Sequence, residues 1–191
     1  MSEISNNFLI PLVLTEPVDE KQLPANLPRQ LDTIINHFRN QAGNMVLFTG
    51  ASGSGRATAA RLLGERVGSE VYRVDLAALV SKYIGETEKH LLDIFEEAGQ
   101  HRLVLFFDEA DALFGKRSGI RDTADRYANL DINYLLKRIE EHPGIAIISS
   151  NAPENLDATL IRAVRWKIEL DRPAPKKPPS LWQRILGWFR R

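Results

Sequence analysis

A glycine-rich loop that joins an apolar run to a helical segment constrains the fold of this chain most strongly. The run at residues 45–49 is short, apolar and followed by glycine, which indicates a buried strand. Gly50 and Gly55 then frame a loop that leads into a helical pattern near residues 56–67. In such a unit, backbone N–H groups and the start of the helix face the same point and favour an anion there. The unit therefore predicts a parallel strand with an anion site at its end.

Strands and helices alternate along the rest of the chain. Four further apolar runs predict strands, at residues 70–75, 103–107, 144–149 and 167–170. Helical spacing of apolar residues predicts three further helices, near residues 28–40, 86–99 and 125–141. Strands that alternate with helices form an open parallel sheet covered on both faces. We therefore expect an α/β fold of three layers, α/β/α, with a five-stranded parallel sheet.

Proline marks both ends of the predicted core. Residues 1–27 contain several prolines and are interpreted as an extended N-terminal arm, whereas residues 28–172 are expected to form the core domain. Residues 173–191 begin as a stiff linker rich in proline and lysine and finish with an amphipathic helix candidate at 180–191. This last segment either docks on the core or on another subunit, lies on an anionic membrane surface, or forms a solvated tail.

The charge balance narrows the class of partner. The 191 residues include 25 basic and 25 acidic side chains, and this net charge of zero argues against wholesale nucleic-acid binding. The absence of cysteine excludes disulfides and thiolate metal sites. No run approaches the roughly 20 apolar residues that span a bilayer, and residues 1–7 lack the pattern of a secretory signal. The cytoplasm is therefore the expected location.

The glycine loop follows the P-loop pattern in its glycines and departs from it at two positions. That pattern is glycine, four residues, glycine, lysine and then serine or threonine. Arg56 replaces the lysine with a bulkier planar fork that can still pair with phosphate. Ala57 replaces the hydroxyl that helps to hold Mg²⁺, and Thr58 points about 100° further around the helix. The candidate phosphate-binding residues are Gly50, Ala51, Ser52, Gly53, Ser54, Gly55, Arg56, Ala57 and Thr58.

Taken alone, the glycine loop could equally be a strand-to-helix turn that binds no ligand. A second pattern favours a ligand. The strand predicted at residues 103–107 ends in two adjacent carboxylates, Asp108 and Glu109. In nucleoside triphosphatases of this type the first acid holds Mg²⁺, often through water, and the second polarises the attacking water. Two solvated acids at a strand end are the alternative, which their place after the glycine loop disfavours.

The stretch at residues 108–118, together with residues 125–129, resembles the AAA family of ATPases. More narrowly, it is similar to the AAA proteins associated with phage-tail-like contractile injection systems. The resemblance covers about residues 28–172 and implies the strand order 5-1-4-3-2, ATP and Mg²⁺ as cofactors, and assembly into a homo- or hetero-oligomeric ring. The family normally continues into a helical lid over the nucleotide, and a complete lid is not expected here because the chain has room for only one of its helices.

The resemblance also implies roles for residues elsewhere in the chain. Asn151 matches the polar sensor that orients the attacking water, and Arg162 and Arg165 match the arginine fingers that reach a neighbour's γ-phosphate. A solvated basic pair is the alternative for the two arginines. The residues that match the pore loop, which grips a polypeptide, are Lys82, Tyr83, Ile84 and Gly85. Tyr83 packed on its own domain is the alternative there.

Taken together, these patterns predict an ATP-binding AAA-type protein that keeps its Walker B, sensor and arginine-finger groups beside a degenerate Walker A loop. We expect a weak or partner-dependent ATPase that acts in protein remodelling or assembly, with weakened Mg²⁺ binding. The alternative is a non-hydrolysing scaffold subunit that contributes Arg162 and Arg165 to an active partner. A peripheral membrane adaptor, attached through residues 180–191, is a third interpretation.

Overall fold

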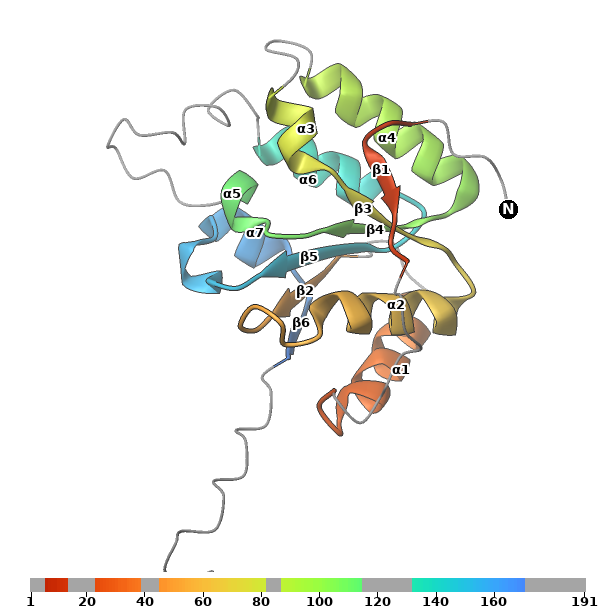
Figure 1. Ribbon diagram of the computed structural model, residues 1–191, viewed down its shortest axis with the longest axis vertical. Coiled ribbons are helices and arrows are strands. Elements are labelled where there is room, and N and C mark those ends of the chain that lie inside the picture. The colour runs from red at the N-terminus through yellow and green to blue at the C-terminus, as the bar shows by residue number, and fades with distance from the viewer. Residues whose placement is uncertain (1–5, 14–22, 39–44, 82–86, 115–131, 171–191) are drawn as a thin grey trace, which may run out of the picture.

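A six-stranded sheet between two layers of helices makes up the fold (Figure 1). The computed structural model describes residues 6–13, 23–38, 45–81, 87–114 and 132–170. The strands are β1 (Leu9–Pro11), β2 (Met45–Thr49), β3 (Val71–Val74), β4 (Val104–Phe107), β5 (Ala146–Ser150) and β6 (Trp166–Glu169). Their order across the sheet is β1-β3-β4-β5-β2-β6. The predicted α/β/α architecture is thereby confirmed.

The strands β2 to β6 run parallel, as the sequence predicts. β3 pairs with β4, β4 with β5, β5 with β2 and β2 with β6. Taken from β6 to β3, this is the order 5-1-4-3-2 that the family resemblance implies. Every residue of β2, β4 and β5 is buried, because helices cover both faces of these central strands. Their carboxyl ends consequently meet at one edge of the sheet.

The sheet has one strand more than predicted, so the expectation of a five-stranded, wholly parallel sheet is wrong. β1 lies within the segment interpreted as an extended arm and runs antiparallel to β3, with Leu9 opposite Val74 and Pro11 opposite Tyr72. Leu9 is buried in the core, and proline is tolerated because β1 is an edge strand. A strand of three residues that includes a proline is too short to show a pattern in the sequence.

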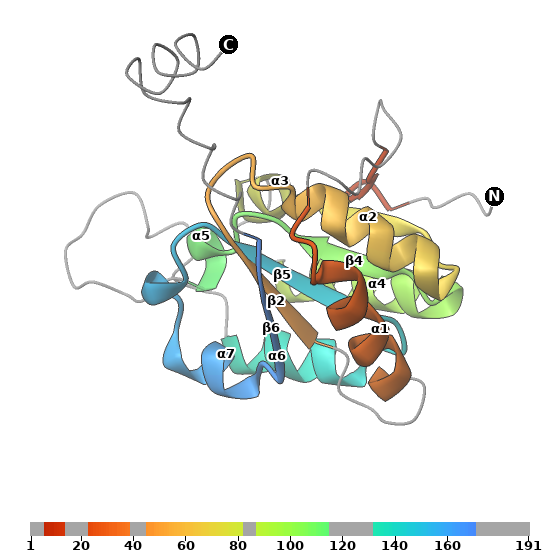
Figure 2. The ribbon, with the colours of Figure 1, turned by 90° about the horizontal axis from the view of Figure 1, so that it is seen from below.

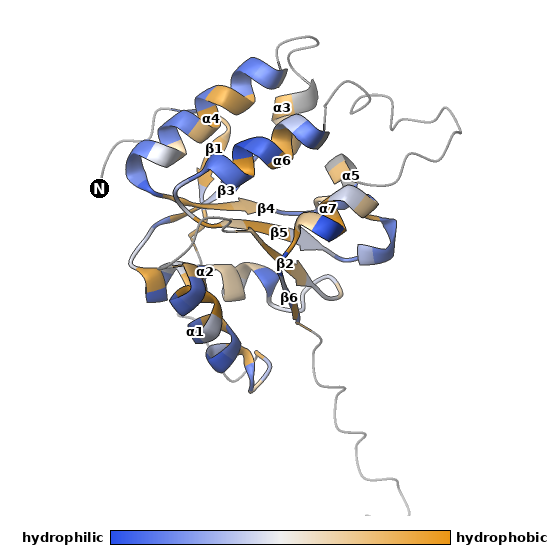
Figure 3. Cartoon of the chain, turned by 180° about the vertical axis from the view of Figure 1, so that it is seen from behind, coloured by the Kyte–Doolittle hydropathy of each residue, from blue (hydrophilic) through white to orange (hydrophobic). Residues whose placement is uncertain are grey.

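Helices cover both faces of the sheet (Figures 2 and 3). One face carries α1 (Leu27–Phe38) and α2 (Arg56–Val67). The opposite face carries α3 (Leu76–Ser81), α4 (Thr87–His101), α6 (Ile132–Glu141) and α7 (Ala158–Ala163). Two short segments, α5 (Asp111–Phe114) and the 3₁₀ helix η3 (Pro153–Asn155), follow β4 and β5. The predictions of α1, α2, α4 and the described part of α6 are confirmed to within a few residues.

Two apolar clusters, one on each face of the sheet, hold the helices in place. Side chains alternate along β2, so that Val46 and Phe48 join the cluster under α1 and α2. Met45 and Leu47 join the cluster on the opposite face. Every residue of β2 is buried, and α2 buries one face in the cluster beneath it, so the strand and the helix are both fixed on either side of the glycine loop.

Several predicted features lie outside the described residues. These are the pore-loop candidates at 82–85, the family-like residues at 115–118 and 125–129, and the linker and terminal helix at 173–191. The domain boundaries at either end of residues 28–172 therefore stay predictions. Within the described ranges, none of the helices combines the length and the apolar character that a membrane span requires.

His142 is buried where β4 begins, at the end of the sheet opposite the glycine loop. Its Nε2 lies 2.9 Å from the carbonyl oxygen of Leu103, and its ring packs edge-on against Phe95. Because a carbonyl can only accept, Nε2 carries a proton and donates it. Burial lowers the pKa of His142 below its ordinary value, although this hydrogen bond opposes the shift. The folded protein therefore favours the neutral imidazole.

The free energy of unfolding should accordingly fall as the pH drops below about 6.5. In that range the unfolded chain binds a proton at His142 that the folded chain excludes, which costs up to about 1.4 kcal/mol per pH unit. Urea unfolding between about pH 7.5 and pH 5.5 measures the slope. His142→Gln keeps a donor for Leu103 without titrating, so its slope should be smaller. Identical slopes in the two proteins would contradict this account of His142.

Candidate functional site

Two glycines shape the loop between β2 and α2. Gly50 has a φ of 148°, and a Cβ there would lie 2.7 Å from both the carbonyl oxygen of Leu170 and Ser54 Oγ. Gly55 directly precedes α2 with a φ of 93°. L side chains rarely adopt these angles, so glycine at both positions lets the chain turn tightly from strand to helix. The backbone N–H of Leu170 donates to the carbonyl oxygen of Thr49 at 2.7 Å and fixes the start of the loop beside β6.

The loop presents polar groups that fit a phosphate. Gly55, the residue before α2, has no side chain, so it cannot cap the first N–H groups of the helix. Ser54 is 4% exposed, and its Oγ has no hydrogen-bond partner within the described part of the chain. N–H groups at a helix start, with a hydroxyl beside them, are donors that favour an anion. The residues present therefore fit the phosphates of a nucleotide.

The side chain of Arg56 folds back against its own loop. Nη1 donates to the carbonyl oxygen of Gly50 at 2.5 Å, and Nη2 lies 3.9 Å from Asp108 Oδ1. Arg56 is only 8% exposed. Its guanidinium, which stays charged in proteins, thus links the loop after β2 to the carboxylate after β4. The structure in this way brings together two patterns that are far apart in the sequence.

Asp108 and Glu109 are adjacent but have different surroundings. Asp108 Oδ1 accepts hydrogen bonds from Ser149 Oγ at 2.9 Å and from the backbone N–H of Glu109 at 3.0 Å. Glu109 is exposed, and its φ of 52° lies in the left-handed region, which is uncommon for a residue other than glycine. Backbone strain of this kind is concentrated at functional sites. The acid predicted to polarise water is therefore accessible, while its neighbour is held by hydrogen bonds.

Asp111 connects the end of β5 to α5, a role that the sequence motifs do not reveal. Its Oδ1 accepts from Ser150 Oγ at 2.5 Å, and its Oδ2 accepts from the backbone N–H of Asn151 at 3.3 Å. Asn151 is exposed directly after β5. Because β5 lies between β2 and β4, Asn151 follows the strand between the glycine loop and the acidic pair. The only sequence signal for Asp111 is a third acid close behind the pair.

The residues beside Asp108, as they are arranged, do not fit a magnesium ion. Ala57 offers no oxygen, and its side chain packs against the apolar cluster of α1 and α2. The Arg56 guanidinium already places a positive charge beside Asp108, where it would repel a second cation. Among the described residues, no group of three or more His, Asp or Glu side chains is placed to hold a metal ion. The role of Asp108 as a metal ligand stays a prediction.

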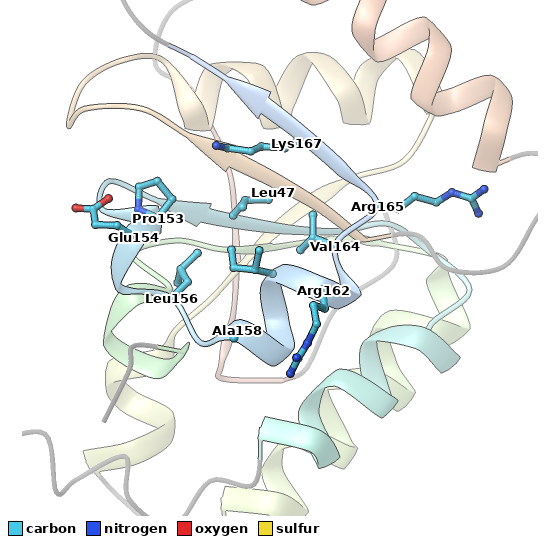
Figure 4. Close-up of a pocket in the computed structure, with 10 residues that line it drawn as sticks. Leu47, Pro153, Glu154, Leu156, Ala158, Arg162, Val164, Arg165 and Lys167 are labelled. Carbon is cyan, nitrogen blue, oxygen red and sulfur yellow. The ribbon is translucent and has the colours of Figure 1, made fainter. Parts of the chain in front are cut away.

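The two predicted arginine fingers line a groove on the other face of the sheet (Figure 4). This groove has a volume of about 640 Å³ and is lined by Leu47 of β2, by Lys167 of β6 and by residues of α7. Arg162 lies on α7 and Arg165 just before β6, and both are exposed. Leu47 belongs to the apolar cluster opposite α2, so the arginines lie across β2 from the helix that follows the glycine loop. The roles of Arg162 and Arg165 as arginine fingers stay predictions.

The start of α7 is fixed by a side-chain cap. The Asp157 carboxylate accepts a hydrogen bond from the backbone N–H of Thr159 at 2.6 Å, and this bond lowers the pKa of Asp157. The backbone N–H of Asp157 in turn donates to the carbonyl oxygen of Phe114 at 2.7 Å. Helix α7, which carries Arg162, is therefore attached to α5 and to the edge of the sheet where Asp108 and Asp111 lie.

The sequence matches the family model described as "ATPase family associated with various cellular activities (AAA)" over residues 46–174, which is more than half of the chain. The chain belongs to the AAA family of ATPases. The matched region of this AAA chain includes the glycine loop, the acidic pair, Asn151 and both arginines.

The curated relatives of this AAA chain are longer than it is. It is 31% identical over 157 residues to ATPase family gene 2 protein of Schizosaccharomyces pombe, across 81% of this chain and 19% of that protein. It is 27% identical over 173 residues to 26S proteasome subunit RPT4 of Saccharomyces cerevisiae, across 88% of this chain and 40% of that protein. It is 34% identical over 149 residues to the AAA family ATPase y4kL of Sinorhizobium fredii, across 76% of this chain and 44% of that protein. The chain thus spans less than half the length of these relatives.

The fold is shared with a solved AAA domain. The structure superposes on the FIGL-1 AAA domain in complex with ADP with a TM-score of 0.65 and 18% sequence identity. The match covers 97% of this chain and 65% of that chain. At this identity the likeness shows the AAA fold.

The contact between Arg56 and Asp108 should be measurable as a coupling in stability. We expect Arg56→Met and Asp108→Asn each to lower the free energy of unfolding. The double variant should lower it by about 1 kcal/mol less than the sum of the two single effects. The reason is that either charge, left alone at this partly buried place, loses its partner. Urea unfolding of the four proteins measures the coupling. Arg56→Met combined with Glu140→Gln, on the exposed side of α6, is the control that should be additive. Additivity of the Arg56 and Asp108 variants would show that the two side chains do not interact.

Proposed function

We propose that this AAA chain binds ATP at residues 50–58 and acts as a weak or partner-dependent ATPase in protein remodelling or assembly. One observation carries the proposal: the glycine loop, Asn151 and the Asp108–Glu109 pair follow the adjacent parallel strands β2, β5 and β4 at the same edge of the sheet. Ligands of open α/β sheets bind outside the carboxyl ends of the strands. This edge is therefore the place where a triphosphate and an attacking water would meet.

Each group at this edge has a distinct task in the proposed reaction. The loop N–H groups and the Arg56 guanidinium would hold the phosphates. Glu109, which is exposed, would accept a proton from the attacking water, and Asn151 would orient that water. Asp108 would position Arg56, because its Oδ1 already accepts two hydrogen bonds and faces the guanidinium. Weak turnover follows, since Ala57 supplies no oxygen for a metal ion that would help to neutralise the leaving phosphate.

The action on other proteins is inferred from the relatives. They include a protein named as a subunit of the 26S proteasome, and AAA ATPases typically assemble into rings. We infer that this chain likewise works with a protein partner or a polypeptide substrate, in an oligomer and in the cytoplasm. The narrower likeness to AAA proteins of phage-tail-like contractile injection systems rests on residues 108–118 and 125–129 and is kept as a hypothesis.

A non-hydrolysing subunit is the second candidate, because exposed arginines lie beside α7 while Ala57 leaves the chain's own site without an oxygen for a metal ion. Ile161 is 41% exposed, and its neighbour Arg162 is exposed on the same helix. An AAA subunit that packs on α7 would cover Ile161 and receive Arg162 near its own nucleotide. In that case the chain would contribute its arginines to an active partner and would keep its own glycine loop for binding alone.

Calorimetric titration with ATP and an assay of phosphate release together test the proposal. The full chain should bind ATP, and Glu109→Gln should lower turnover about 100-fold with ATP affinity unchanged, because only proton transfer is removed. Glu140→Gln, on the exposed side of α6, is the matched control and should change neither quantity.

The outcomes separate the two candidates. Binding with turnover that depends on Glu109 supports the first. If this chain binds ATP without turnover, and the turnover of a mixture with an intact AAA subunit rises equally with wild type and with Glu109→Gln, the second candidate is supported. A folded chain that binds no nucleotide under any condition would overturn the proposed function.

A further inference from the structure

A P-loop site ordinarily has two separate positive charges, a lysine and a metal ion. In this chain Arg56 lies where both would be. The sequence puts it at the position of the phosphate-binding lysine. The geometry puts its Nη2 3.9 Å from Asp108, the acid predicted to hold the metal ion. Nη1 donates at the same time to the carbonyl oxygen of Gly50. One guanidinium thus contacts both the glycine loop and the acid that follows β4.

This guanidinium is built into the site. At 8% exposure, Arg56 is enclosed by the protein and does not extend into solvent. Hydrogen bonds from Ser149 Oγ and from the backbone N–H of Glu109 hold the Asp108 carboxylate that faces it. A planar fork with five N–H donors can keep both Gly50 and Asp108 as partners and still donate to a phosphate oxygen.

A divalent ion is poorly served by the same residues. Magnesium demands near-octahedral oxygen ligands at about 2.0–2.1 Å, and Ala57 has no oxygen where the pattern provides one. The side chain of Ala57 is half-buried and packs against the apolar cluster under α1 and α2, so it supplies no polar atom that could replace the hydroxyl. An ion beside Asp108 would also lie within a few ångström of the Arg56 guanidinium and be repelled by it.

We propose that Arg56 is the resident counter-cation of Asp108, so that the loop binds the phosphates of a nucleoside di- or triphosphate without a divalent metal ion. The inference rests on the proposed nucleotide binding and adds to it that the ligand is the metal-free nucleotide. A magnesium-bound nucleotide would bring a second cation next to Arg56. Magnesium therefore does not strengthen binding, and Asp108 acts as a positioning residue for Arg56.

Titration of the full wild-type chain with ADP and with ATP, in excess EDTA and again in excess Mg²⁺, tests the inference. The dissociation constant in Mg²⁺ should be equal to the one in EDTA within about threefold, or larger. A constant more than about threefold smaller in Mg²⁺ overturns the inference and leaves nucleotide binding in place. No binding in either condition overturns both the inference and the proposed function. This test uses only the wild-type protein, so its result does not depend on whether a variant folds.

Two variants test whether Arg56 and Ala57 together are responsible. Arg56→Lys combined with Ala57→Thr restores the P-loop pattern and should bind ATP at least about tenfold more tightly in Mg²⁺ than in EDTA. Arg61→Met removes another arginine of α2, one that bonds to Glu65, and should keep the wild-type indifference to magnesium. A folded double variant that ignores magnesium as the wild type does would show that Arg56 and Ala57 are not what excludes the metal ion.

Discussion

The contact of one guanidinium with two partners connects the chemistry of this site to its fold. Arg56 reaches from the start of α2 to the carbonyl oxygen of Gly50 and to the carboxylate of Asp108. Opposite charges attract more strongly where the protein shields them from water, and Arg56 is 8% exposed. The link between the glycine loop and Asp108, and with it the proposed preference for a resident cation over a metal ion, depends on this contact.

The parallel sheet makes the contact possible. Because β5 lies between β2 and β4, the glycine loop and the acidic pair are held at a fixed separation at one edge. Ser149 and Ser150, at the end of β5, donate to Asp108 and Asp111 and so join β5 to the segment after β4. The bond from Asp157 to Phe114 continues this set of hydrogen bonds to α7. The glycine loop, through Arg56, and the arginine-bearing helix are thereby connected to the same strand ends from opposite faces of the sheet.

Long and continuous patterns could be predicted from the sequence, whereas short elements and side-chain positions could not. α2 is predicted near residues 56–67 from the glycine loop before it and is observed there, with a glycine in a left-handed conformation at each of its ends. β1 has three residues and α7 has six, so neither is long enough to show a period. Motif spacing identified Arg56 as a phosphate-binding candidate, but its contact with Asp108 depends on residues that only the sheet brings near. The groove could not be predicted either, because β2, α7 and β6, which form it, are separated in the sequence and are brought together only by the fold.

The decisive measurement is a titration of the nitrogen-15-labelled chain with ADP in EDTA, followed through its backbone amide chemical shifts. If phosphates bind at the glycine loop beside a resident guanidinium, the amides of Gly53, Gly55 and Ala57 should shift most. The chemical shift of the Ile161 amide, in the groove beside α7, should not change. Shifts that are largest around Ile161, or that do not occur at all until magnesium is added, would contradict the account.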